Sequence, residues 1–278
     1  MDYREWMQDI QKYSSKEIES QLKQLLTLDK QPVATDTYNE NIQAFLQCCQ
    51  QDPRKSVQKI AASFYKAQQR EQAEKLRTMA MYRTETDLWM SGMVSIVGID
   101  EVGRGCVAGP VVAGAVILPY EPQILGLNDS KKLTPSQREA LDEQIRYAAI
   151  DYAVGEIDAE TIDQIGIANA TFRAMRQAIS RLTFVPDHVL VDAFRIPEVD
   201  VPQTNIVGGD GLSASIAAAS IVAKVYRDKK MTEYHASYPD YGFDRHKGYG
   251  TAEHMQYIAE YGLSSLHRKS FLKSITFV

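Results

Sequence analysis

The distribution of glycine is the strongest constraint on how this chain can fold. The 278 residues contain sixteen glycines, and none of them precedes Gly92. A long segment without glycine favours helices, whereas the part after Gly92 alternates between apolar, strand-like runs and helix-like periodicity. We therefore predict an all-helical N-terminal extension over residues 1–91 and an α/β domain over residues 92–278, with a helical C-terminal part.

Capping signals place two helices. Asp52 and Pro53 predict the N-cap and the first residue of a helix, with no internal breaker as far as Leu88. Thr134 and Gln137 form a predicted capping box at the start of another helix.

Three more helices are expected towards the C-terminus. Apolar residues at three- and four-residue spacing mark the first, and they are Ile162, Ile165, Phe172, Met175, Ile179 and Leu182. The second runs from about residue 213 to about residue 236, and its small alanine face suggests close packing on a sheet. The third follows Thr251.

Three apolar, strand-like segments each finish in an acid. They are Val97–Asp100, which Glu101 follows at once, His188–Asp192 and Asn205–Asp210. Because side chains alternate across a strand, Asp100 and Glu101 cannot both face the core. We therefore expect the pair to lie where water or a metal ion can reach it.

Adjacent carboxylates repel each other, and a hard divalent cation such as Mg²⁺ or Mn²⁺ offsets that repulsion. The alternative for Asp100 and Glu101 is a strand end with two solvated acids. For Asp210 the alternative is a helix cap, because an acid near a helix start complements the helix dipole. Ser213 is a competing cap, which leaves Asp210 free for another role.

The loop after the first two acids is rich in glycine. Gly103 and Gly105 leave backbone N–H and C=O groups uncovered, and Arg104 between them can reach a phosphate. The spacing matches neither a dinucleotide-binding fingerprint nor a P-loop. The apolar run from Val111 to Leu118 predicts a second buried strand directly after the loop. This order argues against a nucleotide-cofactor fold.

Composition excludes several classes of protein. The chain is 44% hydrophobic and 24% charged, which is ordinary globular usage. It has no run of about 18 apolar residues, and its polar N-terminus is unlike a signal peptide, so we expect no membrane contact. Cys48, Cys49 and Cys106 match no disulfide or zinc spacing, and the histidines show no metal-ligand spacing. A cytoplasmic location is expected.

Charge is unevenly distributed along the chain. The 31 basic and 36 acidic residues give a net charge of −5. Residues 100–210 carry 9 basic and 17 acidic side chains, whereas residues 211–278 carry 9 and 6. A cation-loaded centre beside a phosphate-binding surface would need such a distribution, although chance alone can also produce it.

Several motifs, in this order along the chain, resemble those of bacterial ribonuclease HII. They are Gly98–Gly105, Leu127–Leu133, Val191–Asp192, Gly209–Asp210, Ala218–Asp228 and His246–Thr251. The resemblance covers roughly residues 94–273 and is greater than that to the sister family, ribonuclease HIII. The helical extension is similar to that of longer ribonuclease HII proteins from Gram-positive bacteria.

The resemblance implies a ribonuclease H-like fold, in which helices flank a central mixed sheet and Asp100, Glu101, Asp192 and Asp210 gather at one edge. Two Mg²⁺ or Mn²⁺ ions held by such acids can activate a water molecule and stabilise the leaving oxygen of a phosphodiester. The implied reaction is endonucleolytic hydrolysis of the RNA strand of RNA/DNA hybrids. Nicking 5′ to ribonucleotides embedded in duplex DNA is also implied, with 5′-phosphate and 3′-hydroxyl products.

The implied substrate contacts rest on the same resemblance. An enzyme that distinguishes RNA from DNA at one nucleotide must read the 2′-hydroxyl, and the backbone of Gly103, Arg104 and Gly105 offers both a donor and an acceptor. The tyrosine that matches Tyr249 stacks on the deoxyribose at the RNA-to-DNA junction. The candidate phosphate contacts are Lys131, Lys132, Lys224 and Arg227, although lysines on helix surfaces are commonly only solvated.

Two residues depart from the family pattern. Gly209 stands where lysine is common, so a basic contact beside Asp210 is absent, and Cys106 stands where proline is common. Cys106 is also a hypothetical oxidation-sensitive position beside the site. Neither change touches the four acids, so we expect activity.

A function from a different class is also open. The chain could be a non-catalytic binder of RNA/DNA hybrids, with the N-terminal helices as a docking arm for a protein partner in replication or repair. The presence of all four acids favours the enzyme, because a binder gains nothing from negative charge where phosphate must sit.

Overall fold

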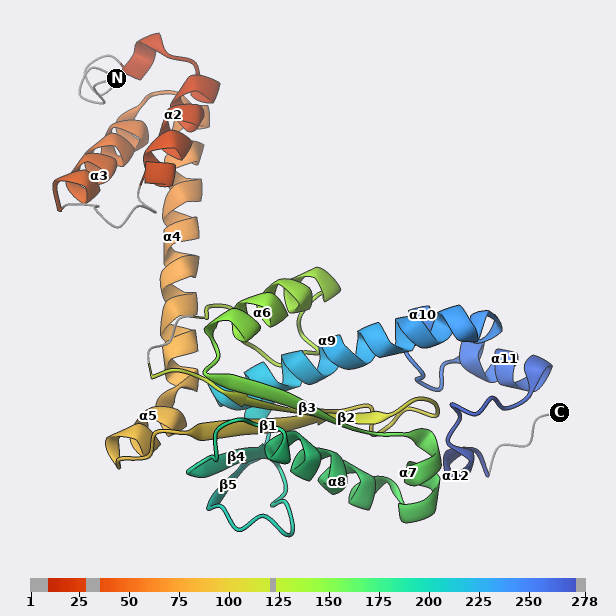
Figure 1. Ribbon diagram of the computed structural model, residues 1–278. Coiled ribbons are helices and arrows are strands. Elements are labelled where there is room, and N and C mark those ends of the chain that lie inside the picture. Colours follow the sequence, from red (N-terminus) through yellow and green to blue (C-terminus); the bar gives the residue numbers. More distant parts are fainter. Residues whose placement is uncertain (1–9, 29–35, 121–123, 274–278) are drawn as a thin grey trace. The chain divides into compact units, whose positions relative to one another are not determined.

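The computed structural model of this chain describes residues 10–28, 36–120 and 124–273 (Figure 1). Its internal contacts form two units, Met1–Lys75 and Leu76–Val278. The division between residues 91 and 92 that the glycine pattern indicates stays a prediction. Among the helices within the described residues, none combines the length and the apolar character needed to cross a membrane.

The first unit is helical. Its elements are η1 (Ile10–Lys12), α2 (Ser15–Leu28), α3 (Asp36–Gln51) and the larger part of α4 (Lys55–Met81). Their apolar faces meet in a core of buried residues: Ile10, Ile18, Leu22, Ile42, Phe45, Leu46, Cys49, Val57 and Ala61.

The start of α4 differs from the prediction. The helix begins at Lys55, two residues later than the expected first position at Pro53. The Asp52 carboxylate accepts hydrogen bonds from the backbone N–H and the Nε of Arg54, at 2.8 and 2.9 Å. Because these bonds hold the carboxylate in a local turn, Asp52 does not cap the helix.

The helix that follows is also interrupted earlier than expected. α4 ends at Met81, and α5 (Arg83–Met90) begins after a break at Tyr82. The Tyr82 side chain is 2% exposed and packs into the core of the second unit, with Leu118 and Leu141. Local sequence shows no breaker here, and burial of this side chain accompanies the break.

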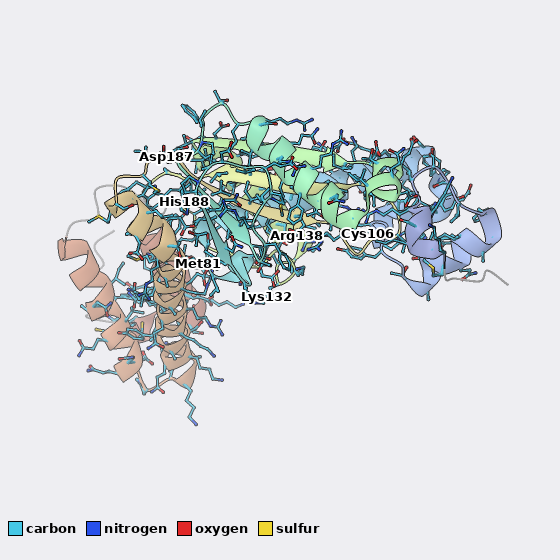
Figure 2. All side chains as sticks on the ribbon, turned by 90° about the horizontal axis from the view of Figure 1, so that it is seen from below. Met81, Cys106, Lys132, Arg138, Asp187 and His188 are labelled. Carbon is cyan, nitrogen blue, oxygen red and sulfur yellow. The ribbon has the colours of Figure 1, made fainter. Side chains whose placement is uncertain are left out.

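The second unit is built on a five-stranded mixed sheet. The strands are β1 (Ile96–Val102), β2 (Val111–Ile117), β3 (Asp151–Ile157), β4 (His188–Asp192) and β5 (Gln203–Ile206), in the order β3-β2-β1-β4-β5. β2 pairs antiparallel with both β1 and β3, whereas β4 pairs parallel with both β1 and β5. Asp187 helps to join β4 to β1, because its carboxylate accepts the backbone N–H groups of Val94 and Ser95 at 2.9 Å each (Figure 2).

Helices cover both faces of this sheet (Figure 1). They are α6 (Pro135–Ala148), α7 (Ala159–Ile165), α8 (Ile167–Ser180) and α9 (Ala214–Ser237), with the short η2 (Gly209–Gly211) before α9. The chain ends in η3 (Pro239–Tyr241), α10 (Phe243–His246), α11 (Ala252–Tyr261) and α12 (Lys269–Leu272). This arrangement confirms the predicted α/β fold with a helical C-terminal part.

The two large helices lie unusually close to the sheet. α9 packs on one face, where a Cβ at Gly98 would overlap the backbone of Ser215. α8 packs on the other face, where a Cβ at Gly155 would overlap the carbonyl oxygen of Ala174. The predicted alanine face of α9 is fully buried, which confirms its close packing.

Side-chain caps start three helices where the sequence predicts them. Thr134, Ser213 and Thr251 are the N-caps of α6, α9 and α11, and the predicted capping box is complete. The single helix predicted over Ile162–Leu182 is wrong, because Gly166 has a φ of +79° and separates α7 from α8.

Candidate active site

Asp100 lies inside β1 and not at its end, because the pairing with β2 continues to Val102. Its side chain is on the α9 face of the sheet, only 6% exposed, and accepts a hydrogen bond from the Ser220 hydroxyl. Burial, reinforced by the charges of Glu101 and Asp192, holds the pKa of Asp100 well above its usual range. The alternative of two solvated acids is therefore wrong for Asp100, which α9 covers, whereas access of a metal ion to the pair stays a prediction.

Glu101 points to the other face of β1, because successive side chains alternate. It lies near Thr171 and Met175 of α8, and its Oε1 accepts a hydrogen bond from Nη1 of Arg104 at 3.1 Å. Burial raises the pKa of Glu101, and the Arg104 guanidinium opposes that rise. Arg104 thus holds this acid while remaining 44% exposed itself.

Asp192 is the common neighbour of the other three acids. The parallel register pairs Ile99 with Val191, so Asp100 and Asp192 follow on adjacent strands. Oδ1 of Asp192 accepts the backbone N–H of Gly209 at 2.9 Å, which ties the end of β4 to the turn that carries Asp210. The Asp192 charge raises the pKa of each of the other three acids.

Asp210 lies in η2, and Ser213 takes the cap position of α9 as expected. Burial and the nearby carboxylates of Asp129 and Asp192 raise the pKa of Asp210. Asp129 is a fifth acid at this edge that we did not predict. The sequence signal that could have indicated Asp129 is its place in the Leu127–Leu133 motif, directly before Ser130. In the structure the Ser130 hydroxyl lies 2.9 Å from that of Ser220.

The acids suit a hard divalent cation, because every candidate donor is a carboxylate oxygen. Burial raises the pKa of Asp100, Glu101 and Asp210, and a bound cation would favour their charged forms. Within the described residues, no three His, Cys, Asp or Glu side chains already stand close enough to hold one ion. Protein donors engage Asp100, Glu101 and Asp192 instead.

The glycine loop is only partly exposed. Gly103 is buried with a φ of +88°, and a Cβ there would overlap Nε of Arg227. The carbonyl of Arg104 accepts a hydrogen bond from Nη1 of Arg268 at 3.1 Å. Gly105, in contrast, is exposed, and a Cβ there would meet no atom within 4 Å. Gly105 is therefore the open position of this loop.

The predicted role of Arg227 is wrong. Arg227 is completely buried and donates to the backbone carbonyls of Pro110, Lys247 and Ala108, at 2.9, 2.8 and 3.1 Å. A guanidinium with these partners cannot reach a phosphate. It instead joins the glycine loop to the segment that precedes Tyr249.

The other candidate substrate residues remain accessible. Tyr249 is 39% exposed, and Nζ of Lys224 lies 5.7 Å from the centre of its ring. Lys224 also forms an ion pair with Asp228 at 2.8 Å. Lys131 and Lys132 are exposed, and the Lys131 charge lowers the pKa of Glu101 and Asp210, so this ammonium lies near the acids.

The structure shows the surroundings of the two residues that depart from the family pattern. A Cβ at Gly209 would lie 2.6 Å from Cδ1 of Ile216, so a side chain there would require Ile216 to move. Cys106 is completely buried, and its thiol lies 3.9 Å from the carbonyl oxygen of Lys247. The hypothesis of an oxidation-sensitive Cys106 does not fit this burial, because oxidants and alkylating agents need access to the sulfur.

Comparisons with known proteins agree with this architecture. The family model for ribonuclease HII matches residues 97–274, and that for the ribonuclease HII N-terminal domain matches residues 14–89. Ribonuclease HII of Desulfitobacterium hafniense is 47% identical over 84% of this chain and 89% of its own length. Ribonuclease HII of Bacillus cereus is 44% identical over 94% of this chain and 96% of its own length.

Solved structures show the same fold for the second unit. The crystal structure of ribonuclease H2 from Pyrococcus horikoshii gives a TM-score of 0.54 at 26% identity, over 63% of this chain and 93% of that one. The ribonuclease HII of Archaeoglobus fulgidus, solved in a complex with PCNA, gives 0.54 at 28% identity, over 63% and 94%. This chain therefore belongs to the ribonuclease HII family of divalent-metal-dependent endoribonucleases that act on RNA/DNA substrates.

Proposed function

We propose that this chain hydrolyses the RNA strand of RNA/DNA hybrids and nicks duplex DNA on the 5′ side of an embedded ribonucleotide, leaving a 5′-phosphate and a 3′-hydroxyl. The observation that supports this most strongly is the position of Asp192. Strand register places it beside Asp100, and a hydrogen bond ties it to the turn of Asp210. Glu101 adjoins Asp100 on β1, so the four acids lie on segments that meet at one end of β1 and β4.

Asp100, Glu101, Asp192 and Asp210 are the residues that would hold two divalent ions, Mg²⁺ or Mn²⁺. When bound, such ions activate a water molecule and stabilise the leaving oxygen of the phosphodiester. The chain itself orients the carboxylates, since Ser220 donates to Asp100 and the Gly209 backbone donates to Asp192. It also supplies Arg104, whose exposed guanidinium can pass from Glu101 to a substrate phosphate.

Recognition of the ribonucleotide falls to the open part of the glycine loop. The carbonyl of Gly103 accepts from the Cys106 N–H, and that of Arg104 accepts from Arg268, so these two groups are occupied. The exposed backbone of Gly105 and the N–H of Arg104 are the groups that we assign to the 2′-hydroxyl. Tyr249 would stack on the next sugar, and Lys131, Lys132 and Lys224 would face phosphates.

We also propose that the N-terminal helices, within residues 1–91, dock a protein partner. An apolar groove of about 440 Å³ on the first unit supports this, with Leu22, Ile60 and Phe64 among its lining residues. None of the residues that we assign to catalysis or substrate lies in that unit. The helices of the first unit are therefore free to serve association and not the reaction.

One assay tests the proposed reaction. A duplex that contains a single ribonucleotide is incubated with the protein and Mg²⁺ or Mn²⁺, and the nick is mapped at nucleotide resolution. We expect one nick, 5′ to the ribonucleotide, and no cut in an all-DNA duplex of the same sequence. Cleavage at other positions, or a nick with a 3′-phosphate, would contradict the proposal.

A further inference from the structure

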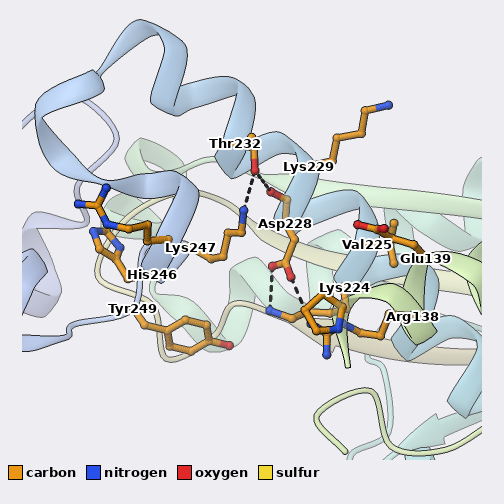
Figure 3. Close-up of a pocket in the computed structure, with 12 residues that line it drawn as sticks. Arg138, Glu139, Lys224, Val225, Asp228, Lys229, Thr232, His246, Lys247 and Tyr249 are labelled. Atoms are coloured by element: carbon orange, nitrogen blue, oxygen red, sulfur yellow. Dashed lines mark hydrogen bonds and ion pairs between the residues drawn. The ribbon is translucent and has the colours of Figure 1, made fainter. Parts of the chain in front are cut away.

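A pocket of about 680 Å³ lies between α6, α9 and the α10 turn (Figure 3). Tyr249 and Lys224, both proposed substrate contacts, form part of its wall. Its charged lining residues are Arg138, Glu139, Lys224, Asp228, Lys229, Arg245 and Lys247. Five of these are cationic and two are acidic, although the whole chain carries a net charge of −5. The lining of the pocket therefore carries an excess of positive charge.

Two of the five cations are not neutralised inside the protein. Asp228 pairs with Lys224 at 2.8 Å and lies 3.9 Å from Arg138. Arg245 pairs with an acid of α11 at 2.7 Å. Among the described residues, Lys229 and Lys247 have no ion-pair partner within 4 Å. Their charges remain available to a ligand.

Lys247 is held in place by its backbone. It is one of three residues other than glycine with a positive φ in the described chain, at φ 52° and ψ 30°. Its carbonyl accepts a hydrogen bond from the buried Arg227, which keeps the strained turn in position. Residues in such conformations concentrate at functional sites, where the surroundings maintain the strain. Here the result is a lysine side chain directed into the pocket (Figure 3).

The ammonium of Lys247 is poorly compensated. Nζ donates to the neutral hydroxyl of Thr232 at 2.6 Å (Figure 3). Burial lowers the pKa of Lys247, and the nearby carboxylates of Asp228 and Asp244 offset this only in part. An ammonium has three donor hydrogens, so two more are available to an anion.

We propose that this pocket binds backbone phosphates of the DNA that lies 3′ to the ribonucleotide. The inference rests on the proposed function, because it takes Tyr249 as the residue at the RNA-to-DNA junction. Nucleic acid is favoured over an acidic peptide because Tyr249 and Lys224, both proposed contacts to the nucleic-acid substrate, line the pocket. A DNA strand that passes Tyr249 would therefore lie directly against the pocket.

The spacing of residues along α9 indicates which phosphates the pocket would contact. Ser220, beside Asp100, is followed by Lys224, Asp228 and Thr232 at four-residue intervals on one side of the helix. With a rise of 1.5 Å per residue, Lys224 lies about 6 Å and Thr232 about 18 Å along the axis from Ser220. DNA advances about 3.4 Å per nucleotide. The pocket therefore serves phosphates about two to five nucleotides beyond the scissile bond.

The test compares two duplexes that differ only in the strand bearing the ribonucleotide. In the first, this strand continues for about ten nucleotides on the 3′ side; in the second, it ends one nucleotide after the ribonucleotide. Lys247→Gln and Lys229→Gln are each measured against Lys230→Gln. The control residue lies next to Lys229 but pairs with Glu156 at 3.3 Å, outside the pocket. All three changes remove one positive charge.

We expect Lys247→Gln and Lys229→Gln to raise KM several-fold on the long duplex, with kcat unchanged, and to have no effect on the short one. For binding to the long duplex in Ca²⁺, the slope of log Kd against log salt concentration should fall by about one for each variant. Equal effects on both duplexes, or an equal effect of Lys230→Gln, would overturn the pocket assignment. Failure of the wild-type protein to nick either duplex would instead overturn the proposed function.

Discussion

His267 donates its Nε2–H to Nε2 of His254 across 3.0 Å, in the buried centre of the C-terminal helices. The direction of this hydrogen bond follows from the other hydrogen-bond partners of the two rings. Nδ1 of His267 accepts the backbone N–H of Ser264 at 2.9 Å, so its hydrogen is on Nε2. Nδ1 of His254 faces the carbonyl oxygen of Tyr249 at 2.9 Å and must carry the hydrogen there. Both rings are neutral, and they fix the backbone of Tyr249.

This pair makes stability depend on pH. Burial lowers the pKa of both His254 and His267 to about 4, below the ordinary value of 6.5. Between these values the unfolded chain takes up protons that the folded chain does not, so the pair should destabilise the fold as pH falls from about 6.5 to 4. The stacked ring of His246, 4.0 Å from His254 between centroids, adds repulsion when both rings are protonated.

The measurement is the melting temperature of the wild type and His267→Gln between pH 7 and pH 4.5. Buried carboxylates with raised pKa, such as Asp100, act in the opposite direction, so the difference between the two proteins isolates the histidine contribution. We expect the variant to be less stable at pH 7 but to lose less on acidification. Parallel curves would show that the histidine pair does not titrate in this range.

Asp192→Asn should remove activity without removing the fold. The amide oxygen can still accept the Gly209 N–H, but the anionic ligand is lost. We expect kcat to fall by more than about a hundredfold, as for loss of a central electrostatic contact, while duplex binding in Ca²⁺ stays largely intact. Asp200→Asn, at an exposed position on the same connection, is the control and should behave as wild type. Substantial residual cutting by Asp192→Asn would count against its role.

Gly103→Ala and Gly105→Ala should separate structure from recognition. At Gly103 the positive φ and the overlap with Arg227 predict a loss of about 1–3 kcal/mol in the free energy of unfolding. At Gly105 the space is open, so the melting temperature should not change, whereas KM for a ribonucleotide substrate should rise. Thermal melts measure the change in stability of each variant, and steady-state kinetics measure the change in KM. A stable Gly105→Ala with unchanged kinetics would remove Gly105 from the substrate contacts.

Glu85 of α5 should matter to the active-site turn. This residue is completely buried, and its Oε1 accepts hydrogen bonds from the Ser213 hydroxyl and the Ser215 N–H, at 2.6 and 2.8 Å. Glu85→Ala leaves both donors unsatisfied and should cost about 3 kcal/mol, whereas Glu85→Gln keeps an acceptor and should cost about 1 kcal/mol. Urea unfolding measures both. Equal losses would show that volume, and not hydrogen bonding, sets the effect.

The same contacts predict different outcomes for two truncations. Removal of residues 1–75 should leave nicking of a naked duplex unchanged, because the second unit keeps Glu85, Tyr82 and Trp89. Removal of residues 1–91 should lower the melting temperature and the activity together. If both truncated proteins matched the full chain, α5 would have no role in the second unit.

The sequence by itself determined what depends on neighbours along the chain. Thr134, Ser213 and Thr251 cap helices because a cap needs only the next three residues, and the alanines of α9 could be recognised as a close-packing face from their spacing alone. The order of the motifs was enough to identify the family and the α/β fold.

Tertiary structure decided what depends on contacts between distant segments. The burial of Asp100 follows from the packing of α9 on β1, and that of Arg227 from carbonyls more than a hundred residues away in the chain. Asp129 joins the acidic edge only because its loop folds back towards Asp210. The sequence does not show whether a charged side chain faces solvent or buried backbone groups. Only the three-dimensional packing brings together the partners that distinguish these two environments.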